Sequence, residues 1–311
     1  MAPVYKIAVI QLHPKPLAIE QNHAKACTFI RTAASLGAHL AVLPEYHLNN
    51  WVPEDEKWLS QCDQYATYLQ NYQSLAKELQ INIIPGTIVE RHSDATTEED
   101  KLINVAYFIS SKGEILGKYQ KKNLWHPERP HLTSSQHEEH EVFETEVGKV
   151  GMLICWDLAF PEAFRELIAK GAKIVVVPTF WTLSDCSEFG LKLNPRAEAL
   201  FLQSSLVSRA FENTCAVVFC NAGGSPSAKP GRANPYAGLS GVAMPFVGML
   251  GDETKDSGEE GMSLVDVNME VLEEAEKQYK IREDIGRDDW HYLYRHSSNI
   301  EPDRVVEKGK L

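Results

Sequence analysis

Three polar side chains have the types needed for acyl transfer, and each stands near the end of a predicted strand. They are Glu45, a lysine within residues 118–122, and Cys155. A thiolate is a strong nucleophile, a carboxylate can take the thiol proton, and an ammonium group can stabilise an oxyanion. Singly each is weak evidence, because most buried cysteines are small core residues and most lone charges are solvated. Together they predict cleavage of a carbonyl compound through a covalent intermediate.

The sequence around Cys155 predicts how the thiol is positioned. Residues 150–154 form a short apolar run typical of a buried parallel strand. Pro161 suits the first position of a helix, which Gly171 ends. Cys155 therefore stands at a strand-to-helix turn, at the carboxyl end of its strand, which is the edge where open α/β sheets bind ligands.

Glu45 occupies an equivalent place in the first part of the chain. Residues 5–12 and 39–45 read as strands, and residues 19–36 between them read as a helix that ends at Gly37. A crossover of this kind predicts parallel pairing. Glu45 would then follow a strand end, as Cys155 does.

The lysines follow a predicted β-hairpin. Its arms are residues 102–109 and 114–119, with a Ser-Ser-Lys-Gly turn between them. Residues 126–141 follow without helical or strand periodicity, and a loop of this length inside a compact domain is usually functional.

Strands and helices alternate along the remaining sequence, with no composition shift that marks a linker. We therefore predict one α/β domain over residues 1–281 and a C-terminal tail, 282–311, at the surface or an interface. The further expected elements are a helix at 64–79, a strand at 81–89, a polar loop at 90–101, a strand at 173–178, a helix at 196–213, a strand at 214–220, paired strands at 242–250 and 262–267, and a helix at 271–281.

Composition limits the classes of partner. The chain has 311 residues, 43% of them hydrophobic, and a formal net charge of -12. No excess of lysine and arginine is present to neutralise phosphates, so we expect neither nucleic acid nor a membrane as partner. The start resembles no signal peptide, and the six cysteines form no Cys-x-x-Cys pair. Reduced thiols and a cytoplasmic location are the expectation.

Four segments resemble the nitrilase superfamily, the carbon–nitrogen hydrolases. Leu-Pro-Glu at 43–45 resembles the general-base motif, and residues 118–124 resemble the lysine motif, in which the third residue before the leucine is Lys121. Ile-Cys-Trp-Asp at 154–157, followed by Phe-Pro-Glu at 160–162, resembles the nucleophile motif. Residues 209–213 and 221–224 resemble a structural segment that follows the active site. The resemblance spans residues 4–267 in the order and spacing of the family, which makes it specific.

The resemblance implies a fold and a set of roles. The fold is a four-layer α-β-β-α sandwich, at least dimeric, with no metal or organic cofactor. Glu45 would be the general base, Lys121 the oxyanion-stabilising cation and Cys155 the nucleophile. Glu128 resembles an assisting glutamate, and other glutamates of the same loop compete for that role: Glu138, Glu139 and Glu141.

The predicted substrate is a small molecule with an amide or N-carbamoyl group. Asp157 after the Cys-Trp pair resembles the amidase and carbamoylase branches, whereas nitrilases typically carry Glu there. A nitrile is the alternative substrate. Four rings near the motif strands predict a pocket for aromatic or bulky apolar groups, with core packing as the alternative role of these rings: Trp125, Trp156, Phe160 and Trp181.

Three rival interpretations are also compatible with the sequence. A papain-like enzyme would pair Cys155 with a loop histidine, and four are available: His126, His131, His137 and His140. A zinc site could use His137 and His140, although their spacing is not that of a helical histidine pair. A catalytically silent protein could keep the same fold as a scaffold.

Overall fold

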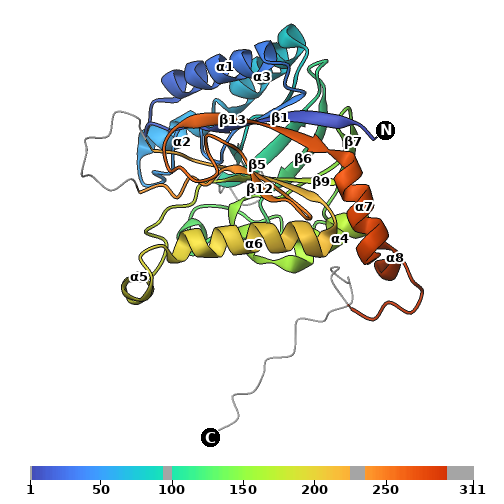
Figure 1. Cartoon of the computed structure of the whole chain (residues 1–311). Coiled ribbons are helices and arrows are strands. Elements are labelled where there is room, and N and C mark those ends of the chain that lie inside the picture. Colours follow the sequence, from blue (N-terminus) through green and yellow to red (C-terminus); the bar gives the residue numbers. More distant parts are fainter. Residues whose placement is uncertain (1, 94–99, 225–234, 293–311) are drawn as a thin grey trace, which may run out of the picture.

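The computed structural model describes residues 2–93, 100–224 and 235–292. Two β-sheets lie face to face between two layers of helices (Figure 1). This is the four-layer α-β-β-α sandwich that the resemblance implied, and that expectation is confirmed.

In the described part of the chain, seven strands form the first sheet, in the order β13-β1-β2-β3-β5-β4 with β6 paired to β5. Their bounds are β1 Val4–Gln11, β2 Leu40–Val42, β3 Asn82–Ile84, β4 Ile88–Ser93, β5 Asp100–Ile109, β6 Ile115–Gln120 and β13 Gly261–Asn268. The predicted parallel pairing holds, because Ile7 of β1 lies opposite Leu40 of β2.

Six described strands form the second sheet, in the order β12-β11-β10-β9-β8-β7. Their bounds are β7 Val142–Thr145, β8 Gly148–Met152, β9 Ile174–Thr179, β10 Ala216–Asn221, β11 Gly241–Met244 and β12 Gly248–Leu250. Strands β8, β9 and β10 are parallel, so their carboxyl ends meet at one edge.

Helices cover the outer face of each sheet. Their bounds are α1 Ile19–Ser35, α2 Glu56–Cys62, α3 Tyr65–Leu79, α4 Pro161–Ala169, α5 Glu188–Leu193, α6 Ala197–Asn213, α7 Met269–Tyr279 and α8 Ile281–Ile285. Helices α1 and α3 lie on the first sheet, and α4 and α6 lie on the second (Figure 1).

Side chains that point alternately to the two faces of each strand divide the hydrophobic core into layers. In β1, Ile7 and Val9 face the second sheet, whereas Ala8 and Ile10 pack in the cluster that contains α1 and α3. Successive strand side chains point to opposite faces, so one buried strand serves two hydrophobic layers. A fully apolar strand is therefore needed in the middle of the sandwich.

Two expectations about strands are wrong. Residues 242–250 and 262–267 do not pair with each other: β11 folds back on β12, and β13 pairs antiparallel with β1 in the other sheet. The turn at residues 245–247 breaks the first segment, and β1 offers β13 eight paired positions. The predicted strand 81–89 is likewise two strands, separated at Pro85 and Gly86.

Helix α2 was not predicted, and the predicted polar loop 90–101 is strand as far as Ser93 and again from Asp100. Residues 94–99 of that loop lie outside the described residues. The predicted division at residue 281 stays a prediction. Helix α8 spans that position, and residues 293–311 of the tail also lie outside the described part of the chain.

Candidate active site

Cys155 lies on a strained turn between β8 and α4. Its φ is +47°, a left-handed conformation that non-glycine residues rarely adopt. A short 3-10 helix, Cys155–Ala159, begins at this residue, and α4 follows with Pro161 at its start. The turn predicted between strand and helix is therefore present. Strain of this kind persists only where the surrounding structure imposes it, and it is concentrated at functional sites.

Asp157 is a buried residue that holds this turn. One carboxylate oxygen accepts the backbone N–H of Ile154 at 2.9 Å and the hydroxyl of Tyr119 at 2.8 Å. The other oxygen accepts the backbone and side-chain N–H groups of Asn123, at 2.9 and 2.8 Å. Asp157 therefore ties the cysteine turn to the lysine segment and does not line the pocket.

Glu45 follows β2 and is held by a close backbone contact. Gly86 has a φ of +61°, and a Cβ built on it would lie 1.9 Å from the carbonyl oxygen of Pro44. Only glycine fits this approach, which explains why the strand predicted at 81–89 is interrupted there. The close packing of Gly86 against the backbone of Pro44 therefore restrains the segment that carries Glu45.

The Glu45 carboxylate is fully buried and accepts three described hydrogen bonds. One oxygen accepts Asn104 Nδ2 and Lys121 Nζ, both at 2.8 Å, and the other accepts the backbone N–H of Phe180 at 3.0 Å. Burial raises the pKa of Glu45 to about 7, although Lys121 acts in the opposite direction. The nearby Cys155 side chain also favours the Glu45 carboxylate and lowers its pKa.

Lys121 lies between two carboxylates. Its side chain has no solvent exposure, and its Nζ is 2.8 Å from Glu45 and 2.7 Å from Glu128. Burial would lower the pKa of Lys121, but the charges of Glu128 and Glu45 outweigh burial and raise the pKa well above its usual value. The group is therefore an ammonium ion.

Glu128 completes the buried cluster from the 3-10 helix His126–Glu128. One of its oxygens accepts Lys121 Nζ and the hydroxyl of Tyr46, and the other accepts the backbone N–H of Trp125 at 2.7 Å. The structure thus brings together four predicted residues on four separate segments: Glu45, Lys121, Glu128 and Cys155.

The Cys155 thiol is protonated in this environment. Burial raises the pKa of the thiol well above its usual value, the negative charge of Glu45 adds to that effect, and Lys121 opposes it. A group that is neutral at rest needs a base before it can attack. The neighbouring carboxyl of Glu45 is the candidate base.

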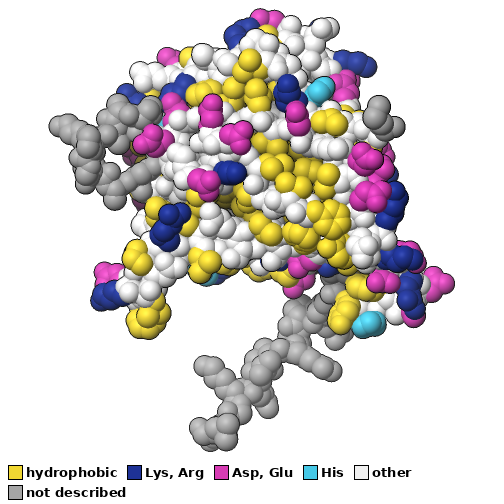
Figure 2. Space-filling model, in the orientation of Figure 1, with side chains coloured by type: hydrophobic (Ala, Val, Ile, Leu, Met, Phe, Trp, Pro, Cys, Tyr) yellow, Lys and Arg dark blue, Asp and Glu magenta, His cyan; other side chains and the backbone are white. Residues whose placement is uncertain are grey.

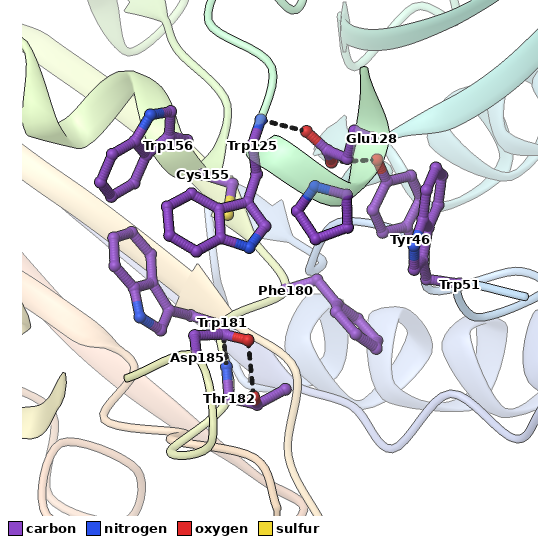
Figure 3. A pocket seen from close by; sticks show the side chains of 11 residues that line it. Tyr46, Trp51, Trp125, Glu128, Cys155, Trp156, Phe180, Trp181, Thr182 and Asp185 are labelled. Atoms are coloured by element: carbon purple, nitrogen blue, oxygen red, sulfur yellow. Dashed lines mark hydrogen bonds between the residues drawn. The ribbon is translucent and has the colours of Figure 1, made fainter. Parts of the chain in front are cut away.

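A pocket opens above Cys155 (Figure 3). Its empty volume, including the open mouth, is about 550 Å³. Polar lining groups are few: Glu128, Cys155, Thr182 and Asp185. The walls are mainly aromatic: Tyr46, Trp51, Trp125, Trp156, Phe180 and Trp181.

Three of the four predicted aromatic residues line this pocket, and Phe160 does not. The rings of Trp125 and Trp156 have centroids 4.5 Å apart, and Trp156 and Trp181 are 5.5 Å apart. Phe160 stands edge-on to Trp156 at 6.1 Å, at the start of α4. It therefore supports a pocket wall without forming one, because the proline that follows turns the chain into the helix.

The rival residues lie elsewhere. Lys122 donates to the carbonyl oxygens of Gln136 and Glu138, away from Glu45. Glu139 is an exposed partner of Lys170, and the side chain of His140 binds Glu166 at 2.9 Å. No histidine is among the described residues that line the pocket. Within the described ranges, no three histidine, cysteine or acidic side chains are placed to hold a metal ion.

Sequence reasoning missed the residues that orient the candidate catalytic groups. Asn104 is fully buried in the middle of β5, and its side chain donates to Glu45. A single amide within an apolar strand is a usable signal, since buried polar groups need partners. Tyr46 and Phe180 offered no comparable pattern.

Comparison with known families decides the classification. The profile described as carbon-nitrogen hydrolase matches residues 6–277. The chain belongs to this family. It is a hydrolase that acts on carbon–nitrogen bonds, as the motif resemblance indicated.

Relatives in this family carry both amidase and nitrilase names. A 2-oxoglutaramate amidase of Bacillus subtilis is 28% identical over 214 residues, 68% of this chain and 72% of that protein. A nitrilase of Pyrococcus abyssi is 27% identical over 276 residues, 84% and 90% of the two chains. A carbon-nitrogen hydrolase structure from Helicobacter pylori has the same fold, with a TM-score of 0.77, 21% identity, and coverage of 91% and 95%. No described helix is long and apolar enough to cross a membrane.

Proposed function

We propose that this hydrolase cleaves a small-molecule amide or N-carbamoyl group through a thioester on Cys155. The observation that carries the proposal is the buried contact of Lys121 with Glu45 and Glu128 beside the Cys155 thiol. A buried carboxylate and a cation lie beside a thiol that lines the pocket, and acyl transfer needs groups of these three types. The intact set speaks against a silent scaffold.

In the first half-reaction Glu45 takes the proton of the Cys155 thiol while the sulfur attacks the carbonyl carbon. The carbonyl π electrons move to oxygen and form an oxyanion. Lys121 has three ammonium N–H groups and two carboxylate partners, so one donor remains for this oxyanion. The backbone N–H of Trp156 lies in the first turn of a 3-10 helix, where it has no intrahelical acceptor, and we assign it as the second donor.

The oxyanion then collapses and the C–N bond breaks. Glu45 returns its proton to the departing nitrogen, which leaves as ammonia or an amine. Water enters, gives a proton to Glu45 and attacks the thioester, and the thiolate recovers that proton as the acid leaves. Glu128 holds Lys121 and Tyr46 in place, so we assign it a positioning role.

A screen for ammonia release tests the proposed function. Purified protein is offered amides, N-carbamoyl amines and nitriles with matched side chains. We expect turnover of at least one amide or N-carbamoyl compound, with loss of turnover in Cys155→Ala. Turnover that survives in Cys155→Ala would refute the thioester route.

Nitriles are expected to be poorer substrates than amides. An amide passes through an oxyanion that the two proposed donors would bind, whereas a nitrile first forms a thioimidate whose nitrogen must gain a proton. The two proposed donors match the oxyanion, so we expect kcat/KM to be at least about tenfold larger for the amide than for the nitrile with the same side chain. The nitrilase name of the Pyrococcus relative makes the nitrile the relevant alternative. A larger kcat/KM for the nitrile would reverse the substrate assignment and leave the three catalytic residues in place.

We propose that the protein is a homodimer, joined across an apolar surface. Figure 2 shows a hydrophobic patch over β12, between β13 and α6. Phe246 and Val247 lie in the turn before β12 and are each 51% exposed, and Phe246 contacts the rings of Phe211 and Tyr279. Exposed apolar patches of this kind mark interfaces.

Light scattering of Phe246→Asp tests the dimer. We expect the dimer to dissociate at concentrations at which the unmodified protein stays dimeric. Phe189→Asp is the matched control, because Phe189 is also exposed and lies in α5, away from the patch. A dimer that tolerates Phe246→Asp as well as Phe189→Asp would exclude this patch as the interface.

We also propose a cytoplasmic location. All six cysteines fall within the described residues and are free thiols. Reduced thiols are usual in the cytosol and uncommon in secreted proteins.

A further inference from the structure

The pocket contains a carboxylate that the proposed chemistry does not use. Asp185 lines the wall on the side of Phe180 and Trp181 (Figure 3). Its two oxygens accept the backbone N–H of Thr182 at 2.8 Å and the Thr182 hydroxyl at 2.9 Å. Each oxygen accepts one described bond, and a carboxylate oxygen has about two lone-pair sites, so Asp185 can accept further hydrogen bonds at the pocket wall.

The charges around Asp185 are unbalanced. Glu128 also lines the pocket, but Lys121 compensates its charge from below. Asp185 has no lysine or arginine partner among the described residues, and no described lining residue of the pocket is cationic. Burial raises the pKa of Asp185 and the charge of Glu128 adds to that effect, whereas the two hydrogen bonds from Thr182 lower the pKa and favour the carboxylate. The pocket therefore has a site of negative potential beside its aromatic walls.

Aromatic faces and a carboxylate together suit a positive charge. Trp51, Trp125 and Trp181 expose rings to the same pocket as Asp185. The face of an indole attracts ammonium and guanidinium groups, and the attraction increases when the cation is desolvated. The same walls also bind the apolar chain that would link such a cation to the scissile bond.

Resting on the proposed function, we propose that Asp185 and the aromatic walls select substrates with a cationic nitrogen distant from the scissile C–N bond. The substrate class is an ω-amino or ω-guanidino amide or N-carbamoyl amine. Its positive end would bind Asp185, and its apolar chain would lie against the tryptophans. An acidic amide such as 2-oxoglutaramate, named for the Bacillus relative, would meet like charge and bind poorly.

Binding and turnover are measured separately, so that the proposed hydrolysis and the proposed preference for cationic substrates can be refuted independently. Binding uses the full-length Cys155→Ala protein and the fluorescence of the pocket tryptophans. The ligands are ω-amino amides of increasing chain length, their methyl-terminated isosteres, and 2-oxoglutaramate. Turnover of the same compounds is followed by ammonia release from the unmodified enzyme.

We expect the best ω-amino amide to exceed its methyl isostere at least about tenfold in affinity and in kcat/KM. In Asp185→Asn the ratio between the ω-amino amide and its methyl isostere, in affinity and in kcat/KM, should fall to about one. The oxygen of the introduced amide can still accept the Thr182 N–H, so the turn is kept. Glu188→Gln is the control for net charge, because Glu188 is exposed in α5 and does not line the pocket. It should leave the ratio unchanged.

Three results would overturn this inference. The first is a neutral or acidic amide that binds as tightly as the cationic one. The second is a preference for the cationic ligand that survives in Asp185→Asn. The third is an equal loss of affinity for all ligands in Asp185→Asn, which would indicate that Asp185 only holds its turn. Absence of turnover with an intact cation preference in binding would refute the proposed function alone.

Discussion

Cys155→Ala is expected to lower kcat/KM for the best amide by at least about 10⁴-fold, because no other thiol lies at the pocket floor. The variant should remain folded. The side chain is buried, and replacing its CH₂–SH group by a methyl group should cost about 1 kcal/mol of unfolding free energy. Alanine also meets the left-handed conformation of residue 155 with a strain similar to that of cysteine. Steady-state ammonia release and the thermal unfolding midpoint measure the two effects.

Cys27→Ala is the matched control for this substitution. Cys27 is half-buried in α1 on the outer side of the first sheet, away from the pocket. We expect its activity to equal that of the unmodified protein. More than a few per cent of activity in a folded Cys155→Ala protein would show that another group is the nucleophile.

Glu45→Gln is expected to lower kcat/KM by about 10³-fold, the contribution typical of a positioned general base. The glutamine cannot take the thiol proton, and the thiol does not ionise alone because burial raises its pKa. Lys121 keeps Glu128 as a partner, so the buried ammonium is not left uncompensated. The NH₂ group of the glutamine must face a donor, either the backbone N–H of Phe180 or the ammonium group of Lys121. This unsatisfied contact should lower the free energy of unfolding by about 1–3 kcal/mol.

The pH profile gives this variant a second readout. Burial raises the pKa of Glu45 to about 7, so the carboxyl is protonated and inactive as a base below that pH. We therefore expect kcat/KM of the unmodified enzyme to rise with pH through about 7. That rise should be absent from the residual activity of Glu45→Gln.

Glu90→Gln serves as the control for loss of a buried carboxylate. Glu90 is 2% exposed, binds Tyr107 and His92, and does not line the pocket. The Glu90→Gln variant should have a lower free energy of unfolding and the same dependence of kcat/KM on pH as the unmodified enzyme. If kcat/KM of Glu45→Gln still rose with pH through about 7, a group other than Glu45 would be the acceptor of the thiol proton.

The positions of the candidate catalytic residues could be predicted because these residues follow strands. Glu45 follows β2, Lys121 follows β6, and Cys155 comes after β8. Short apolar runs that end in a polar residue are visible in a sequence, and the geometry of a sandwich gathers such ends into one place. The hairpin that leads to Lys121 was predictable for the same reason, since its turn is local.

Long-range pairing and side-chain orientation were not predictable in this way. Strand β13 pairs with β1, which is about 250 residues earlier, and no local pattern distinguishes that partner from β11. Asp157 lies in a recognisable motif, yet its carboxylate accepts hydrogen bonds from its own turn and from the lysine segment and does not line the pocket. Asp185 has no sequence signal at all. Its place in the pocket depends on the turn that begins at Thr182.

The buried ion cluster makes Glu45 a better position for substitution than Lys121. Lys121→Met would leave Glu45 and Glu128 buried without a counter-charge, a change that typically costs about 3–5 kcal/mol. Loss of activity in that variant would mix chemistry with unfolding. Glu45→Gln removes the proposed base and preserves the Lys121–Glu128 pair.

Mass spectrometry of the acylated enzyme tests the central claim most directly. The protein is mixed with a slowly hydrolysed amide, quenched in acid during turnover and digested. We predict that the peptide containing Cys155 gains the mass of the acyl group, and that peptides with the other five cysteines stay unmodified. Acylation of a different residue during turnover, with the Cys155 peptide unchanged, would contradict the account.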